Sequence, residues 1–298
     1  MNQDATGVPA ADLVVQAPEI GTPELKALAR VCGAASINAL PGGEAQAFRL
    51  PRAGNPAEVA AFCARAGFDF GFVPPGQRLD RVRLIAMDMD STLITIECVD
   101  EIADLIGIKP EVAAITASAM RGEIDFRASL TQRVALLAGL DVAALARVYD
   151  ERLRLSPGAE RMLAGFKRAG AKTLLVSGGF TYFTDRLQAR LGLDYTLSNT
   201  LEVVDRKLTG RLVGTIVDGT AKAEEFSRLG GDLKGRDGLT VAFGDGANDV
   251  PMLSRADVSI AYRAKPVLRA HATYAIDHCG LDAALNLFVS PPPAGSRR

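Results

Sequence analysis

Three nearly continuous apolar runs of strand length mark the chain, at residues 82–87, 172–176 and 239–243. Runs of this kind are typical of strands that are buried on both faces of a parallel sheet. Segments with helical periodicity separate them, and this alternation predicts an α/β fold built on a Rossmann-like, mostly parallel sheet. Each run ends in polar residues or glycine, and those ends lie where open α/β sheets bind their ligands.

A long insert at residues 99–155 separates the first run from the second. It is rich in alanine and leucine, and its apolar residues recur at helical spacing. The positions that show this spacing include Ala128, Leu130, Val134, Leu137 and Leu140. The insert follows the carboxyl end of a strand, which favours a helical cap over the ligand-binding edge, although a surface decoration would give the same pattern. Residues 195–214 predict a β-hairpin that closes near residues 205–207.

The first 80 residues predict a small α+β domain ahead of this core. Strands are expected at residues 13–15, 47–50 and 68–73. Two helices are expected between them, with Thr22 and Asn55 as their N-caps and a proline at the first helical position of each. Residues 74–76 are the expected linker into the core.

These patterns set the expected domain limits. The N-terminal domain takes residues 1–80, the core with its cap takes residues 81–288, and a tail takes residues 289–298. Residues 1–10 and the proline-rich tail are expected to be frayed, because proline prevents regular hydrogen bonding and little there could be buried.

Charge and composition argue against nucleic acids and membranes as partners. The chain carries 34 lysine and arginine residues against 35 aspartate and glutamate residues, so it offers no basic excess for a nucleic-acid backbone or an anionic membrane. No stretch approaches the roughly 18 apolar residues of a membrane helix, and the first residues do not resemble a signal peptide. The four cysteines form no CxxC pair and are expected to pack as small apolar residues. We therefore expect a cytoplasmic protein that acts on small molecules and binds neither nucleic acid nor membrane, with a homodimer left open.

Two carboxylates, Asp88 and Asp90, stand one residue apart just after the first apolar run. Hydrolysis of a phosphate monoester needs a nucleophile, a proton donor for the leaving alkoxide, and positive charge near the phosphoryl oxygens. One aspartate can attack phosphorus and form an acyl phosphate, while the other protonates the leaving oxygen and then deprotonates water. A pair of turn or helix-capping aspartates would give the same local pattern.

Two further positions suit the binding of a phosphate. Ser177, Gly178 and Gly179 follow the second run, where a hydroxyl and glycine amides at a strand-to-helix turn can hold phosphate oxygens. Lys222 lies near the start of a predicted helix, where it could neutralise an aspartyl nucleophile and a phosphate together. Taken singly, a plain glycine turn and a solvated surface lysine explain these residues as well.

An acidic loop at residues 244–249 follows the third run. Carboxylate oxygens suit a hard cation such as Mg²⁺, so Asp245 is a candidate ligand and Asp249 a candidate for holding its waters. His271 and His278 lie outside this loop and are expected to be surface or packing residues instead of metal ligands. The aspartate pair, the serine, the lysine and the acidic loop each stand beside a strand end or a helix start, and such an ordered set is improbable by chance.

The four segments together resemble the motifs of the haloacid dehalogenase superfamily. Residues 88–92 (Asp-Met-Asp-Ser-Thr) are similar to its first motif, DxDxT, and residues 244–249 (Gly-Asp-Gly-Ala-Asn-Asp) to its fourth, GDGxND, with Ser177 and Lys222 at the second and third. The resemblance spans residues 82–288 and implies an aspartyl-phosphate mechanism with Mg²⁺ as cofactor. It implies catalysis by Asp88 and Asp90. The residues expected to hold the metal are Asp88, Asp90 through its backbone carbonyl, Asp245 and Asp249, and those expected to contact the phosphoryl group are Ser177, Gly178, Lys222 and Asn248.

Two stretches resemble the phosphoserine phosphatases within that superfamily. Residues 97–103 are similar to their E-x-x-D-E-I-A segment, and residues 120–134 are similar to their M-x-G-x-x-x-F-x-x-S-L-x-x-R-V segment. This resemblance implies hydrolysis of O-phospho-L-serine to L-serine and phosphate, the last step of serine biosynthesis.

The same resemblance implies how phosphoserine would be recognised. Glu97 is expected to hold its amino group, and Arg133 its carboxylate, which arginine can bind through two parallel hydrogen bonds. Met120 and Phe126 are expected to line the apolar side of the pocket.

Alternative functions remain open at this point. A phosphotransferase that passes the phosphoryl group to another hydroxyl, such as that of homoserine, would use the same catalytic residues. A non-catalytic, amino-acid-binding regulator is opposed by the intact Asp88 and Asp90. Longer members of the family carry an ACT-like N-terminal extension, with which the expected element order is compatible, but a structural or dimerising role suits these residues as well as serine sensing. A fragment of a cation pump is excluded because no membrane span is present.

Overall fold

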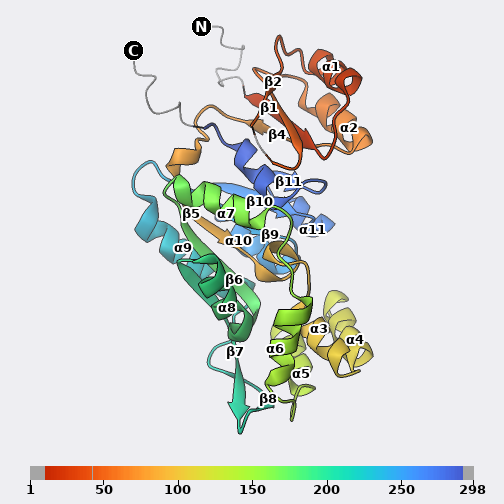
Figure 1. Ribbon diagram of the computed structural model, residues 1–298, viewed down its shortest axis with the longest axis vertical. Coiled ribbons are helices and arrows are strands. Elements are labelled where there is room, and N and C mark those ends of the chain that lie inside the picture. The colour runs from red at the N-terminus through yellow and green to blue at the C-terminus, as the bar shows by residue number, and fades with distance from the viewer. Residues whose placement is uncertain (1–10, 42, 291–298) are drawn as a thin grey trace.

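The computed structural model describes residues 11–41 and 43–290. It contains a four-stranded sheet formed by the first part of the chain and a seven-stranded sheet formed by the rest. In Figure 1 the four-stranded sheet lies at one end of the long axis and helices α3 to α6 lie at the other. The ends that we expected to be frayed, residues 1–10 and 291–298, lie outside the described residues. Within the described residues, no helix combines the length and the apolar character needed to cross a membrane.

The larger sheet has the strand order β11-β10-β9-β5-β6-β7-β8. Its strands are β5 (Val82–Met87), β6 (Lys172–Phe180), β7 (Tyr195–Val204), β8 (Lys207–Val213), β9 (Leu239–Gly244), β10 (Val258–Tyr262) and β11 (Tyr274–Ile276). All neighbours run parallel except β7 and β8. The predicted α/β fold with a mostly parallel sheet is confirmed, and β5, β6 and β9 coincide with the three apolar runs. The sequence pattern did not predict β10 or β11, which are short.

The strand order reverses at β5. The chain builds β6, β7 and β8 on one side of β5 and then returns to build β9, β10 and β11 on the other. The helices of this region are α7 (Ala159–Arg168), α8 (Thr181–Leu191), α9 (Gly219–Lys234), α10 (Val250–Leu253) and α11 (Pro266–Arg269). Leu84 and Ala86 pack in the layer of α9 and α10, whereas Ile85 and Met87 pack in the layer that contains α7. Such a reversal leaves a crevice beyond the carboxyl ends of the central strands.

The insert after β5 is helical, as expected. It comprises α3 (Cys98–Leu105), α4 (Lys109–Met120), α5 (Phe126–Ala135) and α6 (Ala143–Arg147). Asp125 begins α5 as its N-cap, with its Oδ1 accepting a hydrogen bond from Ala128 N at 2.7 Å. These helices gather beyond the carboxyl ends of the strands, on the side of the sheet away from the four-stranded unit (Figure 1).

Strands β7 and β8 form the predicted hairpin. Its turn residues Asp205 and Arg206 have φ values of 48° and 64°, the left-handed conformation that two-residue hairpin turns require. The far edge of β8 is paired with the insert, because Leu208 donates to Leu140 O and accepts from Gly139 N, both at 2.8 Å. The hairpin therefore supports the helical cap from the side.

The four-stranded sheet is antiparallel throughout, in the order β2-β3-β1-β4. Its strands are β1 (Asp12–Ala17), β2 (Asn38–Ala39), β3 (Gln46–Leu50) and β4 (Asp69–Val73), and its helices are α1 (Thr22–Val31) and α2 (Pro56–Ala66). Leu13 and Val15 pack with the helices, whereas Val14 joins the core of the larger sheet. This alternation follows the two-residue period of a strand that is covered on both faces.

The two expected N-caps of this region fare differently. Thr22 is the first helical residue of α1 and Gly21 takes the cap position, so the expectation for Thr22 is wrong. Asn55 does precede α2, at a φ of 55°, but its Nδ2 donates to Val31 O at 2.7 Å and it caps nothing with its side chain. The Asn55 side chain, which the local sequence predicts to cap α2, instead makes a tertiary hydrogen bond to α1. The domain limits themselves stay a prediction, although Val289, which we placed in the tail, donates to Gln77 O at 2.8 Å.

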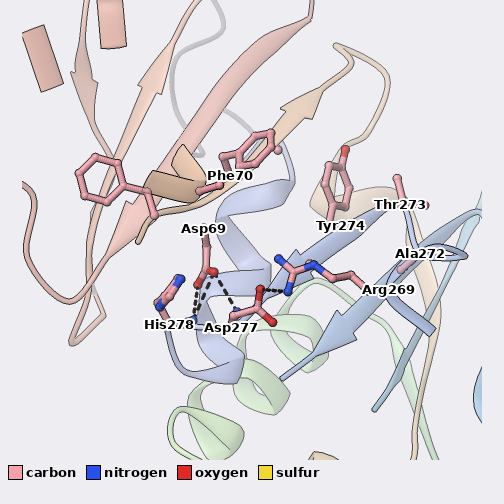
Figure 2. A pocket seen from close by; sticks show the side chains of 12 residues that line it. Asp69, Phe70, Arg269, Ala272, Thr273, Tyr274, Asp277 and His278 are labelled. Carbon is pink, nitrogen blue, oxygen red and sulfur yellow. Dashed lines mark hydrogen bonds and ion pairs between the residues drawn. The ribbon is translucent and has the colours of Figure 1, made fainter. Parts of the chain in front are cut away.

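Buried polar groups join the two sheets (Figure 2). Asp69 of β4 is only 3% exposed and accepts hydrogen bonds from the backbone amides of Asp277, His278 and Cys279, at 2.8 to 3.2 Å. Tyr274 of β11 donates its hydroxyl to Phe72 O at 3.0 Å. Burying a carboxylate is costly unless it is hydrogen-bonded, so these contacts fix one sheet against the other.

Gly71 of β4 is expected to tolerate no side chain. A Cβ there would lie 2.5 Å from Tyr274 Cδ1 and 2.9 Å from Leu287 Cδ2. Gly71→Ala should therefore lower the free energy of unfolding by about 1–3 kcal/mol, the usual cost of overpacking. Gly231→Ala in α9 is the control, because a Cβ there meets no atom within 4 Å and a helix favours alanine. Urea unfolding followed by circular dichroism measures both, and equal stability of the two variants would contradict this account.

Candidate active site

The carboxyl ends of three neighbouring strands bring the predicted residues together. Asp88 follows β5, Ser177 lies near the end of β6, and Asp245 follows β9. A cavity of about 120 Å³ lies between these strand ends and the helical insert. The predicted residues that line it are Asp88, Asp90, Glu97, Phe126, Arg133, Ser177, Gly178, Asp245 and Asn248. Lys222 and Asp249 lie against Asp88 behind this lining.

Lys222 forms the centre of a buried ion network. Its Nζ lies 2.8 Å from Asp88 Oδ1 and 2.9 Å from Asp249 Oδ1, and all three side chains are buried. Asp218 caps α9 by accepting from Ala221 N at 3.0 Å, which places Lys222 in the first helical turn. Burial alone lowers the pKa of Lys222, but the charges of Asp249 and Asp88 more than offset it and the pKa is raised. Lys222 is thus a permanent positive charge beneath the cavity.

Asp88 is held in place by several donors. Its Oδ1 accepts from Met89 N at 2.7 Å, and its Oδ2 accepts from Asn248 Nδ2 at 3.4 Å. Burial, and then the charge of Asp249, raise the pKa of Asp88 well above its usual range, with Lys222 acting in the opposite direction.

Three buried carboxylates form a group that could hold a cation. Asp88, Asp245 and Asp249 each offer an oxygen within 4.8 Å of the others. Burial and the charge of Asp249 raise the pKa of Asp245 to about 6. Lys222 and, at 3.8 Å from Asp245, Lys265 are two positive charges against three carboxylates, so negative charge stays in excess, and this excess and the oxygen donors fit a hard divalent cation. The Asp90 carboxylate is not part of this group, and a ligand role for its backbone carbonyl stays a prediction.

Asp90 has the properties of an acid at neutral pH. Burial, and then the charge of Glu97, raise the pKa of Asp90 to about 7, while a hydrogen bond from Cys98 N at 3.3 Å acts in the opposite direction. Glu97 accepts from Ser91 Oγ at 2.7 Å, and Ser91 adopts the left-handed φ of 55° that turns the chain between them. A carboxyl group with this pKa can give up a proton and take one back near pH 7.

Gly178 and Gly179, called the glycine turn below, lie within the last residues of β6, where the pairing with β7 shifts register, and close contacts there leave no room for side chains. A Cβ on Gly178 would lie 2.8 Å from Phe126 Cζ, and a Cβ on Gly179 would lie 2.8 Å from Met89 Cε. Gly179 N donates to Ser177 Oγ at 2.8 Å, which orients the hydroxyl. Phe126 therefore closes the cavity directly over the glycine turn.

Two predicted pocket residues of the cap, Phe126 and Arg133 on α5, line the cavity. The third, Met120 at the end of α4, does not. Phe126 and Arg133 stand seven residues apart, about two helical turns, and so share a face of α5. Burial lowers the pKa of Arg133, while Asp100 and Glu97 raise it. Met120 is 77% exposed and is not among the lining residues, so its contact with substrate stays a prediction.

The sequence argument missed Lys265. Its side chain lines the cavity, with Nζ 3.8 Å from Asp245 Oδ2, and its backbone N donates to Asp245 O at 2.8 Å. It follows β10 by three residues, at the same edge of the sheet as the other strand ends. A prediction of β10 as a parallel strand would have identified Lys265, because ligand-binding residues follow the carboxyl ends of such strands.

Comparison with known proteins agrees with this geometry. The family model for haloacid dehalogenase-like hydrolases matches residues 85–254, which include Asp88, Ser177, Lys222 and Asp249. A phosphoserine phosphatase of Polaromonas sp. (strain JS666) is 55% identical over 218 residues, which are 72% of this chain and 92% of that protein.

The chain belongs to the haloacid dehalogenase-like hydrolases.

Solved structures of the family extend the likeness beyond the matched motifs. The crystal structure of a probable phosphoserine phosphatase from Vibrio cholerae superimposes with a TM-score of 0.82 at 34% identity, covering 93% of this chain and 86% of that one. A substrate-bound phosphoserine phosphatase complex superimposes with a TM-score of 0.64 at 37% identity, covering 70% of this chain and 99% of that one. The four-stranded sheet is thus part of the shared structure in the first case, whereas the second corresponds to a shorter protein.

A larger cavity of this hydrolase lies elsewhere and carries none of the predicted residues. It measures about 660 Å³ and lies between β4 and β11, beside Tyr274 (Figure 2). Its charged groups already bind one another or the backbone: Arg269 pairs with Asp277, and Asp69 accepts three backbone amides. The smaller cavity at the strand ends is therefore the candidate active site.

Removing the Lys222 charge should destabilise this hydrolase most at high pH. In metal-free buffer, Lys222→Met leaves Asp88 and Asp249 buried without a counter-charge, which costs about 3–5 kcal/mol when both are ionised. Burial raises the pKa of Asp88 in the folded state above its unfolded value. The contribution of Asp88 to the free energy of unfolding is therefore fully present below the pKa that this residue has in the unfolded chain. It is lost as the pH rises through the pKa that Asp88 has in the folded protein.

Urea unfolding at pH 5 and pH 8 in the presence of a chelator measures this effect. The loss should be clearly larger at pH 8 than at pH 5. Lys109→Met, which removes an exposed ion pair with Asp104, is the control and should change little at either pH. A pH-independent loss in Lys222→Met would contradict the electrostatic explanation.

Proposed function

We propose that this chain is a phosphoserine phosphatase, which hydrolyses O-phospho-L-serine to L-serine and phosphate through an aspartyl-phosphate intermediate. The observation that carries the proposal is the meeting of two sets of side chains in one cavity. Asp88, Asp90 and Ser177 provide phosphoryl-transfer chemistry, and Glu97 and Arg133 line the same cavity. The proposal is supported by the names of the similar proteins, which are phosphoserine phosphatases.

We propose Mg²⁺ as the cation of this site. The residues that would hold it are Asp88, Asp245 and Asp249, which form the buried carboxylate group, and Asp90 through its backbone carbonyl. When bound, the ion supplies positive charge for the phosphoryl oxygens and for the excess carboxylate charge. The preference of Mg²⁺ for carboxylate oxygens supports this choice.

In the proposed mechanism Asp88 attacks phosphorus with a carboxylate oxygen. The bond from phosphorus to the serine oxygen breaks, and Asp90, whose pKa is raised to about 7, gives its proton to that oxygen. Asp90 is then a base, and it takes a proton from the water that cleaves the acyl phosphate. Lys222 and the Ser177 hydroxyl offset negative charge on the transferring oxygens, and Gly178 and Asn248 contact the same group.

Substrate choice in this proposal depends on two opposite charges at the cap side of the cavity. The carboxylate of Glu97 suits the ammonium group of phosphoserine, and the guanidinium of Arg133 suits its carboxylate. Phe126, over Gly178, provides the apolar wall. Glu97 at the start of α3 and Phe126 and Arg133 on α5 thus select the amino acid, while the strand ends carry out the chemistry.

The remaining expectations are also proposals. We propose that residues 1–80 form a domain of their own, which their separate sheet and their helix-packed core support. Pairing of the chain into a homodimer and an ACT-like regulatory role for this domain stay predictions.

Replacing the nucleophile should abolish turnover. Asp88→Asn has nearly the same shape, but an amide does not attack phosphorus, so phosphate release from O-phospho-L-serine should fall by a factor of about 10³ or more. Phosphate and serine are both quantified, with and without Mg²⁺. Asp80→Asn, which alters an aspartate outside the cavity, is the control and should keep full activity. Phosphate release by Asp88→Asn at the unchanged rate would refute the mechanism, and an excess of serine over phosphate in the unchanged protein would point to phosphotransfer.

Glu97 and Arg133 should change KM only for substrates that carry the group each one binds, whereas kcat is not compared because Glu97 also helps to raise the pKa of Asp90. Arg133→Gln should raise KM for phosphoserine by about tenfold to a hundredfold, the effect of losing a charge-assisted hydrogen bond, and leave phosphoethanolamine unaffected because it has no carboxylate. Glu97→Gln should do the reverse, raising KM for phosphoserine but not for 3-(phosphonooxy)propanoate, which has no amine. Steady-state kinetics on the three esters measure both variants. If either variant changed KM equally for all three esters, the assigned contacts would be contradicted.

A further inference from the structure

Asn199 is a buried amide that none of the predicted roles uses. It lies in β7 opposite Phe180 of β6 and is 2% exposed. Its Nδ2 donates to Gly178 O at 2.8 Å and to Val217 O at 3.4 Å, and its Oδ1 accepts from Val217 N at 2.8 Å. The side chain therefore uses both its donor and its acceptor on the backbones of two other segments.

The two segments that Asn199 joins both carry active-site groups. Gly178 follows Ser177 within the last residues of β6 and lies against the ring of Phe126. Val217 directly precedes Asp218, the N-cap of α9, whose first turn holds Lys222 against Asp88. One side chain thus fixes the spacing between the glycine turn and the start of the lysine helix.

Asn199 also closes the base of the hairpin that supports the cap. Strand β7 pairs with β6 as far as Asn199 and with β8 from Thr200, which lies opposite Val213, and Val217 follows the end of β8 by four residues. Farther along, a Cβ on Gly210 would lie 3.0 Å from Ala138 Cβ, next to the end of α5. The base of the hairpin is therefore tied to the phosphoryl side of the cavity while its far part contacts the cap.

We propose that Asn199 is a positioning residue for phosphoryl transfer, which holds the Ser177–Gly178 turn and the start of α9 at the separation that the transferring phosphoryl group requires. This inference rests on the proposed function, since it concerns the same cavity. Asn199 touches neither the reacting atoms nor the groups that would bind the serine part of the substrate. Its loss should therefore lower the rate of phosphoryl transfer from every ester alike.

The chemistry of the carboxamide explains why asparagine occupies this position. An aspartate of the same shape accepts from Val217 N but cannot donate to Gly178 O, and it would place a carboxylate against a carbonyl oxygen. A serine is too short to bridge the two backbones. In either variant the glycine turn and the lysine helix lose their common support, and a small misplacement of catalytic groups can cost up to about a hundredfold in rate.

The test uses Asn199→Asp and Asn199→Ser in the full-length protein, with two esters. For both O-phospho-L-serine and p-nitrophenyl phosphate, kcat per folded molecule should fall by about tenfold to a hundredfold, and KM for phosphoserine should change little. Arg133→Gln, by contrast, should affect phosphoserine alone. The folded fraction is measured by circular dichroism and thermal melting, so that a variant that folds poorly is still scored per folded molecule.

Thr184→Val is the matched control. Thr184 is fully buried and its hydroxyl lies 2.7 Å from that of Ser198, the neighbour of Asn199 in β7, so this variant loses a buried hydrogen bond that touches no active-site segment. It should keep kcat while losing stability. If Asn199→Asp and Asn199→Ser keep kcat within about twofold of the unchanged protein, or lose it no more than Thr184→Val, the positioning role is overturned.

The p-nitrophenyl phosphate assay separates this inference from the proposed substrate. If the unchanged protein hydrolyses p-nitrophenyl phosphate but not phosphoserine, the substrate assignment fails and the Asn199 variants are judged on p-nitrophenyl phosphate alone. A loss of kcat there would still support the positioning role, and its retention would still overturn it.

Discussion

The active site depends on one buried interaction, the ion pairs of Lys222 with the carboxylates of Asp88 and Asp249. An ammonium group and two carboxylates are stable away from water only when each is paired and held in place. The N-cap of α9 fixes the lysine, and the backbone amides of Asp245 and Gly246 donate to Asp249 Oδ2, both at 3.2 Å. With Asp245 beside them, negative charge remains in excess, and this excess gives the site its affinity for a cation.

The two proposed roles of the cavity, phosphoryl transfer and substrate selection, come from different parts of the chain. The strand ends supply the rigidly held groups to which we assign phosphoryl transfer, because parallel strands in the centre of the sheet are covered on both faces. The cap supplies Phe126 and Arg133 from one face of α5. The hairpin of β7 and β8 links the two parts, since backbone hydrogen bonds tie β8 to the end of the cap and Asn199 ties the hairpin base to the glycine turn. Cap position and catalytic geometry therefore share a structural support.

The interface between the two sheets is built on polar contacts as well as apolar ones. Asp69 and the hydroxyl of Tyr274 are satisfied by backbone groups across the interface, and Gly71 allows β4 to approach the ring of Tyr274. Such directional bonds specify one relative position of the sheets more tightly than apolar packing alone. The four-stranded unit is thus joined to the strands on the β11 side of the larger sheet, away from the cap.

The sequence by itself determined the strands that are buried on both faces, the helical insert and the order of the motifs. It did so because these depend on local periodicity and on residue types with one dominant chemistry, such as Asp88 or Lys222. The short strands β10 and β11 and the actual N-cap of α1 were not predicted, because short segments and helix ends carry little local signal and tertiary contacts decide them.

Only the tertiary structure decided which side chains share the cavity and which support it. It placed Lys265 and Asn199 beside residues far away in the sequence, and it left Met120 exposed although the same stretch of sequence supplied Phe126 and Arg133. The physical reason is that the position of a side chain relative to distant segments depends on sheet order and helix packing, whereas periodicity records only which residues are buried.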